Sequence, residues 1–244
     1  MKEIKIKRWK LAQKQEGEFW NSLSFEEIER GFELVEKKYK NIFNDISIRF
    51  KPKKIIDVGA GPIPLSTIFS GDVERYAIDP LLSYYENINP NIKEKVNYVK
   101  GLIEKTPYQN EFFDCCVFRN VLDHVLSPQR SLEEVHRILK KDGIVILGIN
   151  IFPPITRMFK KIFEFFSLPG REELHPHFFS ERDLCKIMHS LNFEVVERYE
   201  FSEPYIKDLK NKIAKFFWTV ISFFDNLFGS KNEEYEIIFV CKKI

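Results

Sequence analysis

Cysteine is scarce in this chain of 244 residues, which has only four: Cys115, Cys116, Cys185 and Cys241. No two of them form a CxxC pair, and two fall inside a strand that the sequence predicts to be buried. A disulfide framework and a metal site are therefore not expected. The pattern fits a reducing compartment, and we expect a cytoplasmic protein.

Long hydrophobic runs and an excess of one charge are also missing. No stretch reaches about 18 apolar residues without a charge, so no membrane-spanning helix is expected. The N-terminal MKEIKIKRWK lacks the apolar core of a signal peptide. The net charge of +2 is close to balance, so composition does not favour a nucleic-acid partner. Hydrophobic content of 44% and charged content of 30% are typical of a soluble globular protein.

Strands and helices are predicted to alternate from Lys54 onward. The strand candidates are short runs rich in β-branched and aromatic residues, at 54–58, 74–78, 96–99, 113–118, 144–149, 192–201 and 235–241. A helix is predicted from Pro128, with Ser127 as its N-cap and Gly143 as its stop. The alternation predicts an α/β fold with a doubly wound, mostly parallel sheet.

The N-terminal region precedes this alternation. Residues 1–23 read as a charged arm that contains Trp9 and Trp20. Ser24 then caps a predicted helix, with Glu27 completing a capping box. One apolar face follows at three- and four-residue intervals: Ile28, Phe32, Val35, Tyr39 and Ile42. We expect the region either to lie beside the mouth of the functional site or only to pack on the sheet, with packing alone the preferred interpretation.

The stretch KIIDVGAGP at 54–62 combines an apolar run with two glycines. The run predicts a buried parallel strand that stops in a tight turn. Glycine allows the backbone to come close to a ligand, and residues 65–69 could open a helix whose free N–H groups favour an anion. The alternative is a plain structural turn.

Asp79 closes the second predicted strand, 20 residues after Gly59. An acidic residue at this place accepts hydrogen bonds from ribose hydroxyls in dinucleotide-type folds. The alternative is a turn residue before Pro80. The NAD motif G-x-G-x-x-G is incomplete, because Pro64 stands where the third glycine belongs, so an NAD-dependent enzyme is disfavoured.

Five motifs stand in the order found in class I S-adenosylmethionine-dependent methyltransferases. They are DVGAGP, YAIDP, GLIEKTPY (101–108), FFDCCVFRNVLDHV (112–125) and a helix at 127–143 that ends in LKKDG. With HPHFFSERDL (175–184), the chain resembles small-molecule members of that family over residues 50–200 and the final strand. The resemblance implies a Rossmann-like sheet of seven strands, antiparallel at its last strand, and S-adenosylmethionine as cofactor.

The length of the chain fits one domain of α/β size with additions, and we expect a single methyltransferase domain over 1–244. Residues 1–50 would be an N-terminal helical extension, and 51–150 the cofactor-binding half. Residues 151–244 would be the substrate or lid half, with a helical insertion at about 204–230.

The resemblance implies cofactor-binding roles for Asp57, Gly59, Ala60, Gly61, Asp79, Pro80, Leu102, Ile103 and Asn120. The two glycines would admit the amino-acid part of the cofactor, and Asp57 would orient the turn and the ammonium group. Asp79 would bind both ribose hydroxyls, and Leu102 and Ile103 would flank adenine. Asn120 would lie near the methionyl part.

Two positions depart from the family pattern. Ile63, preceded by Pro62, stands where a further glycine is usual, so the turn is stiffer and more crowded. Leu102 replaces the acidic residue that often binds the adenine amino group, and backbone groups or Glu104 could substitute for it. These departures leave open a degenerate domain that binds a partner without catalysis.

Histidines near the predicted site suggest O-methylation of a small-molecule acceptor, because a hydroxyl acceptor needs a base. His124 follows the fourth strand and is either the base or a supporting residue. His175 and His177 follow the fifth strand and are either catalytic or anchors of their loop. Nucleic-acid methylation is disfavoured, because the fourth-strand motif is not of the NPPY type.

Two aromatic segments, at 155–168 and 212–228, are predicted as helices. Packing against each other or the sheet edge is the preferred interpretation. The alternatives are a lid over an apolar or lipid-linked acceptor, a homodimer face, or peripheral membrane contact.

Overall fold

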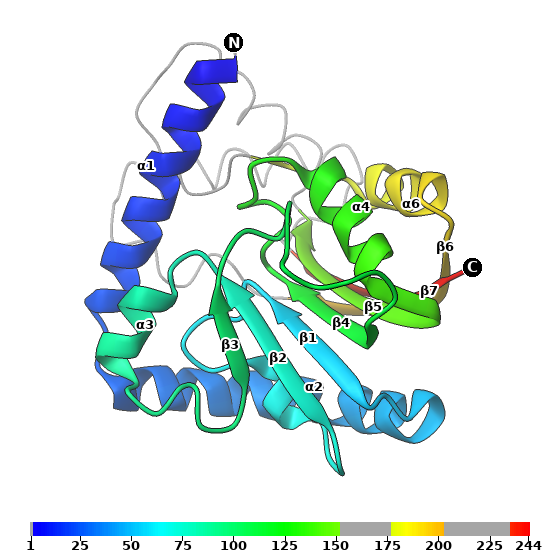
Figure 1. Ribbon diagram of the computed structural model, residues 1–244, viewed down its shortest axis with the longest axis horizontal. Helices are drawn as coiled ribbons and strands as arrows, with labels where there is room; N and C mark the ends of the chain where they lie inside the picture. The colour runs from blue at the N-terminus through cyan, green and yellow to red at the C-terminus, as the bar shows by residue number, and fades with distance from the viewer. Residues whose placement is uncertain (1, 152–176, 203–234) are drawn as a thin grey trace.

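The computed structural model describes residues 2–151, 177–202 and 235–244, and a seven-stranded sheet forms its centre (Figure 1). The strands are β1 Lys54–Val58, β2 Glu74–Asp79, β3 Asn97–Lys100, β4 Phe113–Arg119, β5 Leu139–Ile151, β6 Phe193–Ser202 and β7 Tyr235–Lys243. Their order across the sheet is β3-β2-β1-β4-β5-β7-β6. β1 to β5 run parallel, and β7 lies antiparallel between β5 and β6. The predicted Rossmann-like sheet with an antiparallel last strand is confirmed.

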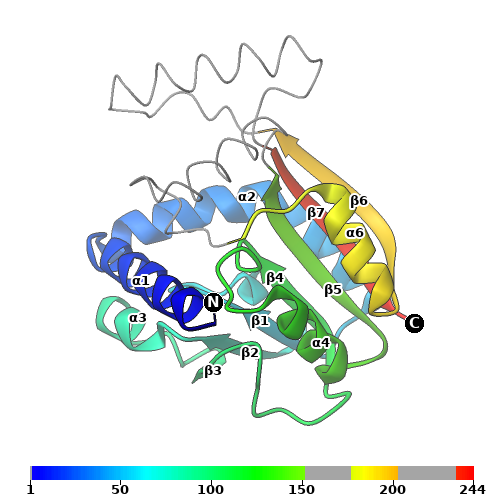
Figure 2. The same cartoon turned by 90° about the horizontal axis from the view of Figure 1, so that it is seen from above.

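Helices cover both faces of the sheet. They are α1 Lys2–Asn21, α2 Phe25–Phe50, α3 Leu82–Ile88, α4 Pro128–Ile138 and α6 Glu181–Ser190. α4 and α6 bury Leu132 and Leu184 against one face, whereas α2 buries Tyr39 and Phe43 against the other. Figure 2 shows α2 on the opposite side of the sheet from α4 and α6. The central strands are therefore covered on both faces, as parallel sheets require.

Cys115 and Cys116 are consecutive in β4 and fully buried. Because successive side chains of a strand point to opposite faces, Cys115 packs on the α2 side and Cys116 on the α4 side. Burial raises the pKa of both thiols well above the ordinary value. They therefore stay protonated and act as small apolar side chains.

Residues 2–21, which the sequence predicted as a charged arm within a helical extension, form helix α1. The apolar residues of α1 do not gather on one face, and periodicity therefore gave no helix signal. Gly17 lets the helix approach α3 closely, because a Cβ there would lie 2.9 Å from the ring of Tyr84. Trp20 also meets Tyr85 edge-on, with ring centroids 6.1 Å apart. Tertiary contacts hold this helix in place.

The two predicted helix starts differ in their capping. Ser24 and Glu27 form the predicted capping box, with hydrogen bonds of 3.3 and 2.8 Å. Ser127 occupies the N-cap of α4 before Pro128, but its side chain makes no capping bond. Its backbone N–H instead donates to the carboxylate of Glu104 at 3.1 Å.

β5 begins earlier than the sequence predicted. α4 ends at Ile138, and Leu139 already pairs with Phe113 of β4. Gly143 lies inside β5, so its prediction as the stop of the helix was wrong. A Cβ at Gly143 would lie 2.9 Å from the carbonyl oxygen of Lys140. Close backbone approach explains this glycine.

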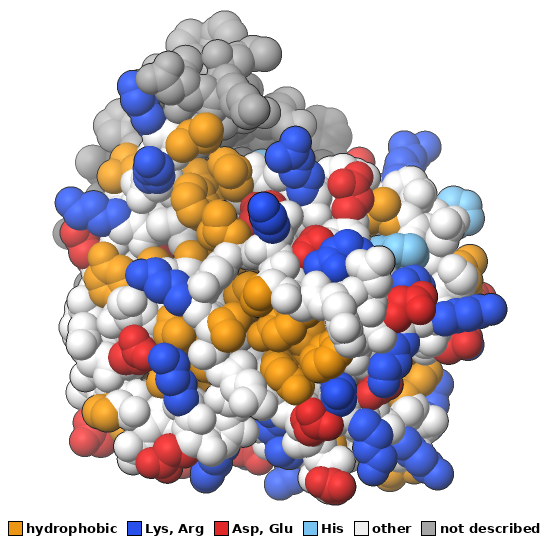
Figure 3. Space-filling view, in the orientation of Figure 1, with side chains coloured by type: hydrophobic (Ala, Val, Ile, Leu, Met, Phe, Trp, Pro, Cys, Tyr) orange, Lys and Arg blue, Asp and Glu red, His pale blue; other side chains and the backbone are white. Residues whose placement is uncertain are grey.

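Several predictions fall outside the described residues: the aromatic helices at 155–168 and 212–228, the helical insertion at about 204–230, and His175. Among the helices that the structure describes, none has the length and apolar character needed to cross a membrane. On the face shown in Figure 3, Lys and Arg side chains are interspersed with Asp and Glu. That face carries no basic stripe of the kind that binds nucleic acid.

Candidate active site

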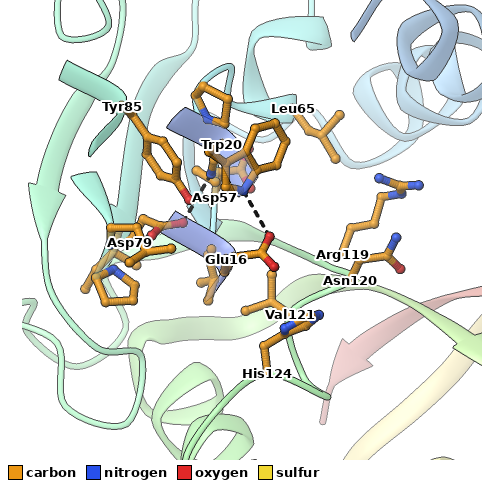
Figure 4. A pocket seen from close by; sticks show the side chains of 18 of the residues that line it. Glu16, Trp20, Asp57, Leu65, Asp79, Tyr85, Arg119, Asn120, Val121 and His124 are labelled. Atoms are coloured by element: carbon orange, nitrogen blue, oxygen red, sulfur yellow. Dashed lines mark hydrogen bonds between the residues drawn. The ribbon is translucent and has the colours of Figure 1, made fainter. Parts of the chain in front are cut away.

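A cavity of about 570 Å³ opens at the carboxyl ends of β1, β2 and β4 (Figure 4). The strand order reverses here, since β1 pairs with β2 on one side and β4 on the other. Open α/β sheets bind ligands at such a point. The cavity is lined by every residue for which the sequence predicted a cofactor contact: Asp57, Gly59, Ala60, Gly61, Asp79, Pro80, Leu102, Ile103 and Asn120.

The turn after β1 needs both of its glycines, for different reasons. Gly59 and Gly61 have φ values of 61° and 64°, which glycine adopts without strain. A Cβ at Gly59 would lie 2.3 Å from a methyl carbon of Val121. A Cβ at Gly61 would meet nothing within 4 Å, because it would project into open space beside the cavity. The backbone at Gly61 is therefore free to approach a ligand.

The buried carboxylate of Asp57 stabilises the chain that follows this turn. Its side chain is 2% exposed, and its Oδ2 accepts the backbone N–H of Ser66 at 2.9 Å. Burial raises the pKa of Asp57 to about 7 despite the lowering effect of its hydrogen bonds. The helix expected at 65–69 is a single 3₁₀ turn, Leu65–Ile68, and Asp57 occupies one of its N–H groups.

Asp79 joins the turn after β1 to the end of β2. Its Oδ2 accepts the N–H of Gly61 at 3.2 Å, and its Oδ1 accepts the N–H of Leu81 at 2.8 Å. Burial raises the pKa of Asp79 to about 6, and the nearby charge of Glu16 adds to the rise. The side chain of Tyr85 also hydrogen-bonds this carboxylate. Because the two oxygens together have about four lone-pair sites, the carboxylate can still accept a hydrogen bond from a ligand in the cavity.

The loop after β3 brings Leu102, Ile103 and Glu104 to the cavity. The two apolar residues give a surface suited to a flat ring. Oε1 of Glu104 accepts the backbone N–H groups of Leu126 and Ser127 at 2.8 and 3.1 Å. Glu104 therefore holds the chain before α4 in place. Because its Oε1 is already used in this way, Glu104 is less available to bind the adenine amino group in place of the acidic residue that Leu102 replaces.

Asn120 follows β4 in an unusual backbone conformation, with φ of 52°. Its N–H donates to the carbonyl of Gly148 in β5 at 2.8 Å. Its side-chain Oδ1 is buried and has no hydrogen-bond partner among the described residues. Such a buried acceptor is costly unless a ligand or water satisfies it. Together with the open space at Gly61, this oxygen fits a cofactor that carries an ammonium group.

His124 and Asp123 lie on the loop after β4, and both line the cavity. Nε2 of His124 is 3.6 Å from Oδ2 of Asp123. The backbone carbonyl of His124 accepts the indole N–H of Trp9, on α1, at 2.9 Å. The loop that carries the predicted base is thereby attached to the N-terminal helix.

His177 is not among the described residues that line the cavity, but it contacts two that are. Its ring Nε2 lies 2.9 Å from the carbonyl oxygen of Val125, and its backbone N–H donates to the carbonyl of Asp123 at 3.2 Å. His177 thus links its own loop to the loop of His124. These contacts match the alternative of a loop anchor.

Helix α1 contributes a wall of the cavity, which matches the alternative interpretation of the N-terminal region, a position beside the functional site, and not the preferred one of packing alone. Its inner side brings Trp9, Gln13, Glu16, Phe19 and Trp20 to the cavity. The indole N–H of Trp20 donates to Oε1 of Glu16 at 2.9 Å (Figure 4). Two tryptophans in an otherwise charged segment were the available signal.

Arg119 ends β4 at the cavity and is fixed by an ion pair with Glu236 of β7. The Nε–Oε1 distance is 2.6 Å, and Glu236 is almost fully buried. Burial opposes ionisation of Glu236, but the charge of Arg119 holds its pKa below the ordinary value. Arg119 Nε also donates to the hydroxyl of Tyr39 at 3.1 Å. This network joins helix α2, which carries Tyr39, to strands β4 and β7.

The cavity is acidic. Among the described residues that line it, six carry carboxyl groups, namely Glu16, Glu27, Asp57, Asp79, Glu104 and Asp123, and one Arg or Lys, Arg119, is present. No group of three or more His, Cys, Asp or Glu in the described ranges is arranged to hold a metal ion. The excess of carboxyl groups in the lining suits a ligand with positive charge.

Residues 28–198 match the sequence model of a family described as "Methyltransferase domain". The ubiquinone/menaquinone biosynthesis C-methyltransferase UbiE of Haemophilus ducreyi is 25% identical over 137 residues, which cover 51% of this chain and 53% of that protein. The ubiquinone biosynthesis O-methyltransferase of Rickettsia canadensis is 29% identical over 120 residues, 48% of this chain and 49% of that protein. The chain thus spans about half the length of these curated relatives.

The solved structure of YcgJ from Bacillus subtilis has the same fold. It superposes with a TM-score of 0.59 over 81% of this chain and 97% of that chain, at 16% sequence identity. At this identity the likeness concerns the fold alone.

Proposed function

Because the chain belongs to the methyltransferase-domain family, we propose that it transfers a methyl group from S-adenosylmethionine to the oxygen of a small acceptor molecule. One observation carries the proposal. A single cavity has the glycine turn and Asp79 on one wall and His124 with Asp123 on another. Direct methyl transfer depends chiefly on alignment of the acceptor with the methyl group, and a cavity of this form provides it.

Residues at or just after the carboxyl ends of β1, β2, β3 and β4 would hold the cofactor. Asp79 accepts hydrogen bonds from the ribose hydroxyls, and Leu102 and Ile103 flank the adenine. Gly61 allows close backbone approach, and Oδ1 of Asn120 accepts from the ammonium group. Asp57 orients the turn through Ser66. When bound, S-adenosylmethionine supplies a methyl group on a positively charged sulfur, which retains the carbon–sulfur electron pair as the methyl leaves.

His124 is the proposed base. It takes the hydroxyl proton of the acceptor, so that the oxygen can use an electron pair for the new carbon–oxygen bond. Asp123 stabilises the imidazolium that results, because its carboxylate lies 3.6 Å from the ring. His177 positions the loop through Val125, and Trp9 does so from α1.

The proposed acceptor class is a small hydroxylated ring of quinone-precursor type. The two relatives named above act in ubiquinone or menaquinone biosynthesis, one on carbon and one on oxygen. Deprotonation of a ring hydroxyl activates both the oxygen and the neighbouring ring carbons, so one base serves either outcome. Apolar residues of α2, Ile28, Phe32 and Val35, line the cavity and suit an apolar ring or tail. Methylation on carbon is the second candidate for this reason.

Calorimetry and turnover together test the function. Purified protein is titrated with S-adenosylmethionine and then incubated with catechols and with hydroquinones bearing short prenyl tails. We expect cofactor binding that Asp79→Ala weakens, and methylated products identified by mass spectrometry. The proposal would be rejected if wild type showed no binding even at about millimolar cofactor and Asp79→Ala did not differ from it. Binding without turnover across the acceptor panel would instead indicate a binding-only domain.

A further inference from the structure

Glu16 is the acidic residue that α1 brings into the cavity beside Asp79. Its side chain is half-buried, and its Oε1 accepts the indole N–H of Trp20 at 2.9 Å. Its Oε2 has no hydrogen-bond partner among the described residues. Figure 4 shows Glu16 between Asp79 and the loop of Val121 and His124. The carboxylate of Glu16 thus lines the cavity beside the residue proposed to bind ribose.

Glu16 and Asp79 repel each other electrostatically. Burial is the main cause of the raised pKa of Asp79, its backbone hydrogen bonds oppose the rise, and the charge of Glu16 adds to it. The charge of Glu16 also raises the pKa of Tyr85. Two carboxylates at one site are unfavourable unless a cation lies between them or one takes a proton. Arg119, the one Arg or Lys among the described lining residues, is already paired with Glu236. The site therefore favours a ligand that brings its own positive charge.

Glu18 on the same helix shows how a structural carboxylate differs. Its side chain is 62% exposed and pairs with Lys14 at 3.6 Å, one helical turn away. Such surface pairs contribute little to stability. Glu16 faces inward and has no salt-bridge partner among the described residues. Helix formation alone does not explain this placement.

We propose that Glu16 is a cofactor-binding residue that distinguishes the positively charged methyl donor from its uncharged thioether product. The proposal rests on the proposed function for the identity of the ligand. Methyl transfer removes the positive charge from sulfur, and the electrostatic attraction to Glu16 is lost with it. Glu16 therefore favours binding of the donor and weakens retention of the product.

The test compares Glu16→Gln with wild type by calorimetry, using three ligands. S-adenosylmethionine and sinefungin, an unreactive analogue with an amine in place of the sulfonium, are cationic at this position, and S-adenosylhomocysteine is not. Gln keeps an oxygen for the Trp20 indole and removes only the charge. We expect about fivefold weaker binding of the two cationic ligands, with little change for S-adenosylhomocysteine. Glu18→Gln is the matched control and should leave all three affinities unchanged.

Equal weakening of the binding of all three ligands would overturn the proposal, because Glu16 would then have only a structural role in α1. Unchanged affinity for all three would overturn it as well. Thermal unfolding of Glu16→Gln establishes that the variant folds. The proposed function is judged separately, by turnover of wild type with acceptors. Charge discrimination without turnover would support the role of Glu16 and reject the catalytic function.

Discussion

The carboxylate of Asp79 accepts the backbone N–H of Gly61 at 3.2 Å, so the end of β2 holds the turn that follows β1. The same carboxylate is expected to bind ribose. Asp79→Ala should therefore both remove the hydrogen bonding of this carboxylate to the ligand and loosen the turn. We expect cofactor affinity to fall about tenfold to a hundredfold, measured by calorimetry. An unchanged dissociation constant in a folded variant would show that the cofactor does not reach Asp79.

The two turn glycines should respond differently to alanine. Gly61→Ala places a Cβ in open space, so we expect a loss of about 1–2 kcal/mol from the left-handed backbone and a larger effect on cofactor binding. Gly59→Ala adds a clash with Val121 at 2.3 Å and should cost about 3 kcal/mol or more. Denaturant unfolding and calorimetry on both variants check the contrast. Val121→Ala should partly restore stability to Gly59→Ala and not to Gly61→Ala.

Cofactor affinity should depend on pH through Asp79. Its pKa rises from 3.8 to about 6 in the folded, ligand-free protein, and ribose hydroxyls donate to the ionised form. Affinity should therefore fall as the pH decreases below about 6, and Asp79→Asn should remove much of this dependence. Calorimetric titrations across this range measure it. An identical pH profile in the variant would assign the dependence to another group.

The contribution of Asp79 to folding stability should change with pH in the direction opposite to that of cofactor affinity. A raised pKa means that the folded protein binds the proton more tightly than the unfolded chain does. The contribution of Asp79 to stability is therefore fully present below pH 3.8 and is lost as the pH rises through about 6. Asp79→Asn should flatten the pH dependence of the unfolding free energy in this window. Urea denaturation at several pH values gives the slope.

Substitutions of His124 and of His177 should have different effects on kcat and KM. His124→Gln should lower kcat about a hundredfold or more if His124 is the base, with cofactor affinity unchanged. His177→Gln loses the contact with Val125, so its effect should be smaller and should include KM. Loss of activity in His177→Gln but not in His124→Gln would contradict the assignment of His124 as the base.

The strands were predictable because short apolar runs in a parallel sheet are buried on both faces. Asp79 and Gly61 could be placed together because parallel strands end at one edge of the sheet. The ion pair of Arg119 with Glu236 was not predictable, since it joins strands 117 residues apart in the chain. The role of Glu104 was hidden for the same reason: its partners are backbone N–H groups 22 and 23 residues away, and these leave no side-chain pattern.

Helix α1 lies before the residues that match the family, which begin at position 28. Its Trp9 holds the His124 loop and its Glu16 stands beside Asp79. A wall of the cavity is therefore built from residues that precede the matched range. Two proteins that share the matched domain can admit different acceptors when their N-terminal helices differ. Exchanging residues 2–21 between relatives is a direct route to altered selectivity.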